Sequence, residues 1–167
     1  ERPYIAVTVT EKAENSLRAR HPWVYGDEVL SASGPYENGD VVDVRSQKGR
    51  WLGAGFINDN SKIRVRILSR NPNDRCDAAF FRRRLGYAVE CRRTVMGADF
   101  GCCRLVFGES DGLPGLTVDR FGDVLVAQCV CLGMERIKAG LYADLVDIMS
   151  KRGETVSAVY ERNDLAV

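Results

Sequence analysis

Apolar and polar residues alternate along the first seventy residues, and this two-residue period predicts short strands. The clearest case is 62–68, where isoleucine and valine alternate with lysine and arginine. One face of that strand therefore belongs to a core, and the other presents a cationic row. Further strands are predicted at 4–10, 41–45 and 51–57, with a helix capped by Thr10 up to Arg20 and a hairpin turn at 47–50.

From residue 75 onward a helical period replaces part of this alternation. Asp74 is predicted to cap a helix from Arg75 to Thr94, with apolar residues on one face and Arg82–Arg84 opposite. Strands are predicted at 102–107, 116–119, 124–132 and 155–160, and a second amphipathic helix at 135–150. The polar run 71–74 is the best linker candidate. The pattern predicts an α+β fold: a small, mostly β domain at 1–72 and a mixed β-β-α-β domain at 73–167.

Composition agrees with a folded chain, at 45% hydrophobic and 28% charged residues. No apolar run is long enough to span a membrane, and no secretory leader is visible. The chain begins with glutamate, so we expect a fragment of a longer protein. Its six cysteines lack zinc-ligand spacing, and it has one histidine, so we expect neither metal nor disulfides. Reduced, mostly buried cysteines in a cytoplasmic protein are the simpler interpretation.

The net charge of +1 conceals a basic belt. Residues 61–104 carry eleven Lys/Arg and four Asp/Glu, whereas the flanking segments are both net acidic. Such a belt is typical of proteins that bind a phosphate-rich partner. A solvated, charged helix face is the alternative, and charge alone does not decide between the two.

Three segments together resemble one family. They are RHPWVYGDEV at Arg20–Val29, GESDGLPGLTVDRFGD at Gly108–Asp123 and YERND at Tyr160–Asp164. In this order and spacing the chain resembles the bacterial large-subunit (23S) ribosomal RNA cytosine-C5 methyltransferases, which use S-adenosylmethionine. The resemblance covers essentially the whole chain, and the sixteen-residue middle segment is its most specific element.

The resemblance implies an N-terminal PUA domain, a small RNA-binding β-barrel, and then a middle α/β domain. A Rossmann-like methyltransferase domain would follow and is expected to be absent from this chain, since no glycine-rich strand-to-helix turn is present. S-adenosylmethionine would serve the parent enzyme and would not bind this fragment. Ribosomal RNA is the implied partner, and the oligomeric state stays open, with a homodimer among the alternatives.

Basic residues of the first domain are the candidates for RNA contact, through phosphate neutralisation beside aromatic rings. Trp23 is expected in the core, because large aromatic residues dominate the cores of small domains. Alternatively, the cationic rows only keep the domain soluble. The RNA-binding candidates are Arg18, Arg20, His21, Lys48, Arg50, Lys62, Arg64 and Arg66.

The middle segment offers a second set of polar residues, Glu109, Asp111, Gly112, Asp119 and Arg120. A rigid turn, in which Asp111 bonds its own backbone and Gly112 takes a positive φ, is favoured over an acid–base or metal cluster. We expect this loop to face either the missing domain or the RNA. Cys91, beside two arginines, is the cysteine with the most thiolate-favouring neighbours, but no catalytic residue is assigned.

The sequence therefore predicts the RNA-binding N-terminal part of a cytosine-C5 rRNA methyltransferase, with catalysis in a domain outside this chain. A stand-alone RNA-binding adaptor and a protein–protein docking module remain as alternatives.

Overall fold

The computed structural model describes residues 2–162, and the chain divides between Cys76 and Asp77 into two compact units. Asn163 and Asp164, the end of the third motif, lie outside the described residues. None of the described helices combines the length and apolar character needed to cross a membrane. The mixture of helices and sheets confirms the α+β class.

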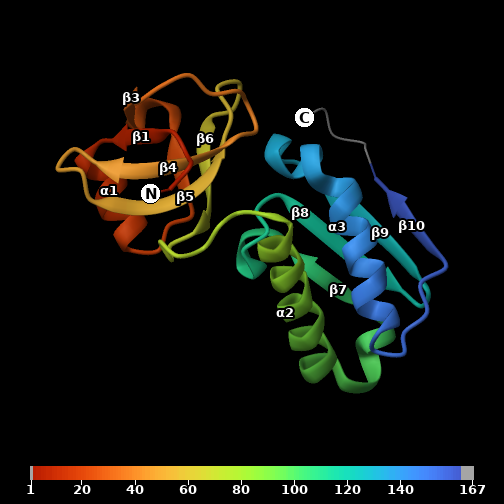
Figure 1. The fold of residues 1–167 in the computed structure, drawn as a ribbon. Coiled ribbons are helices and arrows are strands. Elements are labelled where there is room, and N and C mark those ends of the chain that lie inside the picture. The colour runs from red at the N-terminus through yellow and green to blue at the C-terminus, as the bar shows by residue number, and fades with distance from the viewer. Residues whose placement is uncertain (1, 163–167) are drawn as a thin grey trace. The chain divides into compact units, whose positions relative to one another are not determined.

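The first unit is a curled sheet with strand order β2-β6-β5-β4-β1-β3 (Figure 1). The strands pair antiparallel, except that β1 runs parallel to β4. Their inward residues pack with Ala13 and Leu17 of α1 into one core. The elements are β1 (Ala6–Val9), α1 (Glu11–Arg18), β2 (Trp23–Tyr25), β3 (Val29–Ala32), β4 (Val41–Ser46), β5 (Trp51–Ile57) and β6 (Ile63–Ser69).

The predicted alternation in β6 is confirmed, since Val65 and Ile67 are buried while Arg64 and Arg66 are only partly buried. Thr10 caps α1 as predicted, and its hydroxyl accepts from the Ala13 N–H at 3.3 Å. The short strands β2 and β3 were not predicted, because three or four residues carry too little periodicity to be recognised.

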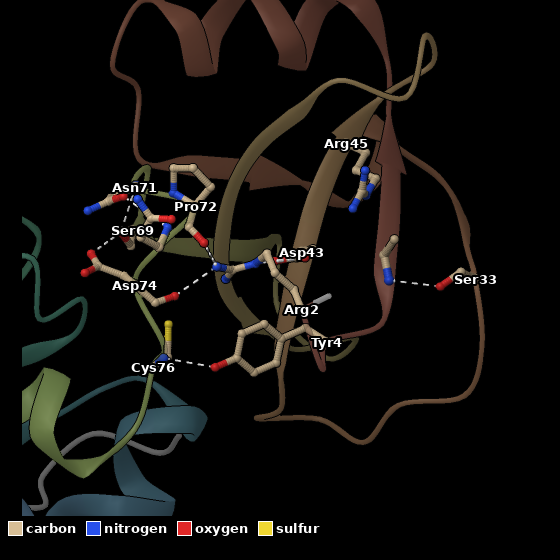
Figure 2. A network of polar contacts seen from close by, with 12 residues as sticks. Arg2, Tyr4, Ser33, Asp43, Arg45, Ser69, Asn71, Pro72, Asp74 and Cys76 are labelled. Atoms are coloured by element: carbon tan, nitrogen blue, oxygen red, sulfur yellow. Dashed lines mark hydrogen bonds and ion pairs between the residues drawn. The ribbon is translucent and has the colours of Figure 1, made fainter.

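The predicted linker is bonded to the first unit (Figure 2). Arg2 Nε donates to both carboxylate oxygens of Asp43 at 2.8 and 3.0 Å, and its Nη1 donates to the carbonyls of Pro72 and Asp74 at 2.5 and 2.9 Å. The Tyr4 hydroxyl accepts from the Cys76 N–H at 2.9 Å. Since Asp43 is 1% exposed, this ion pair anchors residues 72–76 to a buried point of the sheet.

Asp74 does not cap the following helix, and that prediction is wrong. Its carboxylate accepts from the Ser69 hydroxyl at 2.6 Å, whereas Asp77 accepts from the Phe80 N–H at 2.9 Å and caps α2. Both aspartates suit a cap, and the bond to Ser69 decides between them. The helix therefore begins at Ala78 instead of Arg75.

The second unit is a four-stranded sheet of order β10-β9-β8-β7, with α2 and α3 packed against each other on one face (Figure 1). Neighbouring strands run antiparallel except that β10 is parallel to β9. The strand predicted to reach Leu132 ends at Cys129, because α3 already begins at Leu132. The elements are α2 (Ala78–Met96), β7 (Cys102–Phe107), β8 (Leu116–Phe121), β9 (Val124–Cys129), α3 (Leu132–Ser150) and β10 (Ala158–Glu161).

Candidate nucleic-acid interface

Three ring side chains follow one another at and just before strand β2. The His21 ring lies 5.6 Å from that of Trp23 and 6.1 Å from that of Tyr25, measured between centroids. Trp23 is partly buried and Tyr25 is 36% exposed, whereas the intervening Val24 is fully buried. The strand thus turns its aromatic residues outward, and the expectation that Trp23 lies in the core is wrong because Val24 fills that inward position.

Arg66 of β6 lies opposite Trp23 in the strand register. Its guanidinium carbon is 5.7 Å from the centroid of the indole ring. A cation over an aromatic face is worth about 0.5–1 kcal/mol at an exposed site. This contact holds a positive charge directly against the aromatic row.

The loop that leads into β2 contains an unusual backbone conformation. Among residues 2–162, Arg20 is the one non-glycine residue with a positive φ, at 72°. It follows the C-cap of α1, where its N–H donates to the Leu17 carbonyl and the next N–H, that of His21, donates to Ser16, both at 3.0 Å. Glycine normally occupies this position, and a side chain there costs about 1–2 kcal/mol. Such strain in a loop is a pointer to function.

Arg70, at the end of β6, provides a second cation beside Arg20. Its Nη2 donates to the His21 carbonyl at 2.8 Å. Burial, and after it the charge of Arg20, lowers the pKa of the Arg70 guanidinium below its ordinary value. The fold thus holds two like charges together, and a bound anion would relieve their repulsion. We call Arg20, His21, Trp23, Tyr25, Arg66 and Arg70 the β2 surface.

The structure distributes the eight predicted RNA-binding residues over several places. Arg20, His21 and Arg66 lie on the β2 surface, and Arg18 is exposed on the last turn of α1. Arg64 forms an ion pair with Asp59, and Lys62 lies in the loop that precedes β6.

Lys48 and Arg50 lie in the turn between β4 and β5, and Arg50 Nη1 is 3.5 Å from a Glu14 carboxylate oxygen. Arg70 was not predicted from the sequence as a member of this surface. The two-residue spacing of His21, Trp23 and Tyr25 could have indicated a one-sided aromatic row.

In the second unit, the loop after β7 is held from inside the unit. The carboxylate of Asp111 accepts from Arg92 Nη1 and Nη2 at 3.0 and 2.8 Å, and from the Phe107 N–H at 2.6 Å. Gly112 has a φ of 68°, and a Cβ on it would lie 2.5 Å from Arg84 Nη1. The predicted rigid turn is confirmed, with Asp111 bonding a backbone N–H four residues earlier.

Asp119 and Arg120 also have partners within the second unit. The Asp119 carboxylate accepts from Arg104 Nε at 2.8 Å. Glu109 is partly buried and lies in the same loop as Asp111. Arg120 is 6% exposed, donates to Glu154 at 2.6 Å, and lies 4.6 Å from the centre of the Phe100 ring. These contacts stabilise the unit, so a loss of function in an Arg120 variant would not by itself demonstrate contact with RNA.

All six cysteines are free thiols. The expectation that most are buried is wrong: Cys129 and Cys131 are buried, whereas Cys91 and Cys102 are exposed. Burial raises the pKa of Cys129 to about 12, so this thiol is protonated at neutral pH. Among the described residues no three His, Cys, Asp or Glu side chains cluster as a metal site would require.

Known proteins resemble this chain in sequence. A PUA-like domain family matches residues 7–70. The chain is 37% identical over 164 residues to proteins named ribosomal RNA large subunit methyltransferase I from Escherichia coli O1:K1 / APEC and from Shigella flexneri serotype 5b. The resemblance to the large-subunit ribosomal RNA methyltransferases is confirmed. The alignment covers 98% of this chain but 40% of each relative, so the chain spans about two fifths of their length.

Solved structures show the same fold. A putative SAM-dependent methyltransferase from Streptococcus mutans aligns with a TM-score of 0.76 at 16% identity, over 94% of this chain and 40% of that one. A putative methyltransferase complexed with SAH aligns with a TM-score of 0.77, also at 16% identity. At this identity the likeness establishes the fold alone.

Proposed function

We propose that the first unit binds ribosomal RNA through the β2 surface. The observation that carries this proposal is the pair Arg20 and Arg70, two adjacent cations for which no ion pair is found among residues 2–162. A phosphate group would neutralise both, and binding would release the counterions of the RNA backbone. A purely structural role would not require an arginine in a strained conformation beside another arginine.

The aromatic row indicates which form of RNA would bind. Bases of an unpaired strand can stack on the outward rings of Trp23 and Tyr25, whereas the bases of a duplex are already stacked within the helix. The guanidinium of Arg66, over the Trp23 ring, adds charge near such a base. We therefore propose that single-stranded or looped RNA is held here.

The longer protein would be an S-adenosylmethionine-dependent rRNA methyltransferase that acts at C5 of cytosine, and this chain would hold its RNA. The connection from β9 to α3 runs through Val130 and Cys131 and lacks the glycine-rich turn that suits a nucleotide-like ligand. We therefore propose that the cofactor and the target base are bound outside this chain. The free thiols suit the reducing cytoplasm, where we propose the protein works.

The test is the affinity of the 167-residue chain for a labelled 12-nucleotide RNA, measured by fluorescence anisotropy at several salt concentrations. If Arg20, Arg66 and Arg70 neutralise about three phosphates, log K against log salt should have a slope of about −2 for a single strand. The same sequence as a duplex should bind more weakly. Arg20→Gln should reduce both affinity and slope, whereas Arg93→Gln, at an exposed position of α2, should change neither.

Two results would contradict the proposal. Absence of RNA binding at low salt would remove RNA recognition from this part of the chain and favour a docking module. Binding that Arg20→Gln and Arg93→Gln weaken equally would show that overall charge, and not the β2 surface, carries the affinity.

A further inference from the structure

A shallow depression lies at the far end of β2 from Arg20, between the end of this strand and the loop before β6. Tyr25 belongs both to its lining and to the β2 surface. The other lining residues come from the turn after β2 and from the β5–β6 connection. The complete lining is Tyr25, Gly26, Asp27, Asp59, Asn60, Ser61, Lys62 and Arg64.

One wall of the depression is fixed by Arg64. Its guanidinium lies across Gly26, where an added Cβ would be 3.2 Å from Nη2, so only glycine leaves Arg64 its full space. Nη1 of Arg64 bonds Asp59, and the Tyr36 hydroxyl donates to the same carboxylate oxygen at 2.9 Å. The charge of Arg64 is therefore balanced by Asp59, and this pair shapes the depression without attracting an anion.

Two charged groups of opposite sign remain available to a ligand. Lys62 and Asp27 are both exposed, and neither forms an ion pair or side-chain hydrogen bond among residues 2–162. Asn60 is also exposed in the lining, and its backbone N–H donates to the Asn58 side-chain oxygen. A ligand that matches Lys62, Asp27 and the Tyr25 ring needs an anionic part, a hydrogen-bond donor and a flat face.

We propose that this depression binds one unpaired nucleotide whose base carries an exocyclic amino group. The base would stack on Tyr25, its amino group would donate to the Asp27 carboxylate, and Lys62 would neutralise the adjoining phosphate. A bare phosphate site is disfavoured because two carboxylates line the depression. This inference rests on the proposed function, and extends it from RNA binding to base selection.

The spacing fits a continuous strand of RNA along β2. The four residue-to-residue steps from His21 to Tyr25 cover about 13 Å in extended conformation, which equals about four stacked nucleotides at about 3.4 Å each. An RNA whose phosphates are held at Arg20 and Arg70 would therefore reach the depression within a few nucleotides. Octanucleotides are long enough to occupy both places.

The test compares the binding of oligocytidine and oligouridine octamers to the 167-residue chain, since cytosine carries an amino group at C4, where uracil carries a carbonyl oxygen that the Asp27 carboxylate would repel. Oligocytidine should bind about 2- to 10-fold more tightly, the effect of one hydrogen bond. Asp27→Ala should abolish this preference. Lys62→Gln should reduce the salt slope by about 0.7, the value for one phosphate contact, whereas Arg93→Gln, at an exposed position of α2, should leave it unchanged.

Amide NMR shifts on titration with each octamer distinguish the possible failures. Shifts at 20–23 together with shifts at Gly26 and 60–62 support the inference. Shifts confined to 20–23, or equal affinity for both octamers, would overturn it and leave the proposed function intact. No binding of either octamer would overturn both.

Discussion

The second unit and the β2 surface use their arginines in different ways. In the second unit Arg92, Arg104 and Arg120 each pair with a carboxylate of the same unit. Elsewhere in the first unit Arg2 and Arg64 do the same. On the β2 surface, by contrast, Arg20 and Arg70 place like charges together, and Arg66 lies over an aromatic ring. A count of arginines in the sequence does not separate those that pair within the fold from those that gather on the β2 surface.

The largest expected effect concerns stability of the second unit. Asp111→Ala removes the carboxylate that accepts from the Phe107 N–H and from Arg92, and so leaves the partly buried Arg92 guanidinium without its carboxylate partner. The free energy of unfolding should fall by about 2–3 kcal/mol, measured by urea denaturation. Asp123→Ala, at an exposed turn, should stay within about 0.5 kcal/mol. Equal losses in both variants would show that the Arg92 pair contributes little.

RNA affinity should respond most to the aromatic row. Trp23→Leu should weaken binding of single-stranded RNA by about 10- to 100-fold, because stacking on a base is worth about 1–3 kcal/mol. Trp51→Leu replaces a tryptophan that instead contacts Arg2, and it should leave RNA affinity unchanged. Anisotropy titrations measure both, and an equal effect of the two substitutions would argue against the β2 surface.

A substitution at Arg20, in the strained loop before β2, should change RNA affinity without lowering the stability of the fold. Arg20→Gly removes a cation and relaxes a positive φ, so RNA affinity should fall several-fold while unfolding free energy stays equal or rises by about 1 kcal/mol. Arg18→Gly, two residues earlier in α1, should instead cost about 0.5–1 kcal/mol. A destabilised Arg20→Gly protein would show that the loop needs arginine for folding.

The smallest effect is expected at alkaline pH. An unfolded Cys129 thiol ionises near its ordinary pKa of 9.0, whereas the folded one has a pKa of about 12. Between these values the unfolded state binds fewer protons, so stability falls as pH rises. Urea denaturation at about pH 8.5 and about pH 9.7 should show a loss in the wild type about 1 kcal/mol larger than in Cys129→Val. Identical losses in the two proteins would mean that burial does not keep the Cys129 thiol protonated at alkaline pH.

Much of the fold could be predicted from local patterns. The strands at 51–57 and 102–107 match their predicted bounds, and Thr10 caps its helix, because each depends on neighbouring residues alone. The start of α2 was wrong for a non-local reason, the bond from Ser69 that occupies Asp74. For the candidate site, the sequence supplied Arg20, His21 and Arg66, but neither Arg70 nor the pairing of Arg66 with Trp23.

The sequence by itself determined the α+β class, most strands and the resemblance to rRNA methyltransferases, since periodicity and contiguous motifs are properties of the chain order. Only the tertiary structure decided which side chains each charge lies beside. Antiparallel pairing of β2 with β6 sets Trp23 opposite Arg66, although forty-three positions separate them in the chain. Burial and ion pairing depend on such long-range neighbours, so the division between the β2 surface and the paired arginines of the second unit follows from the packing of the strands.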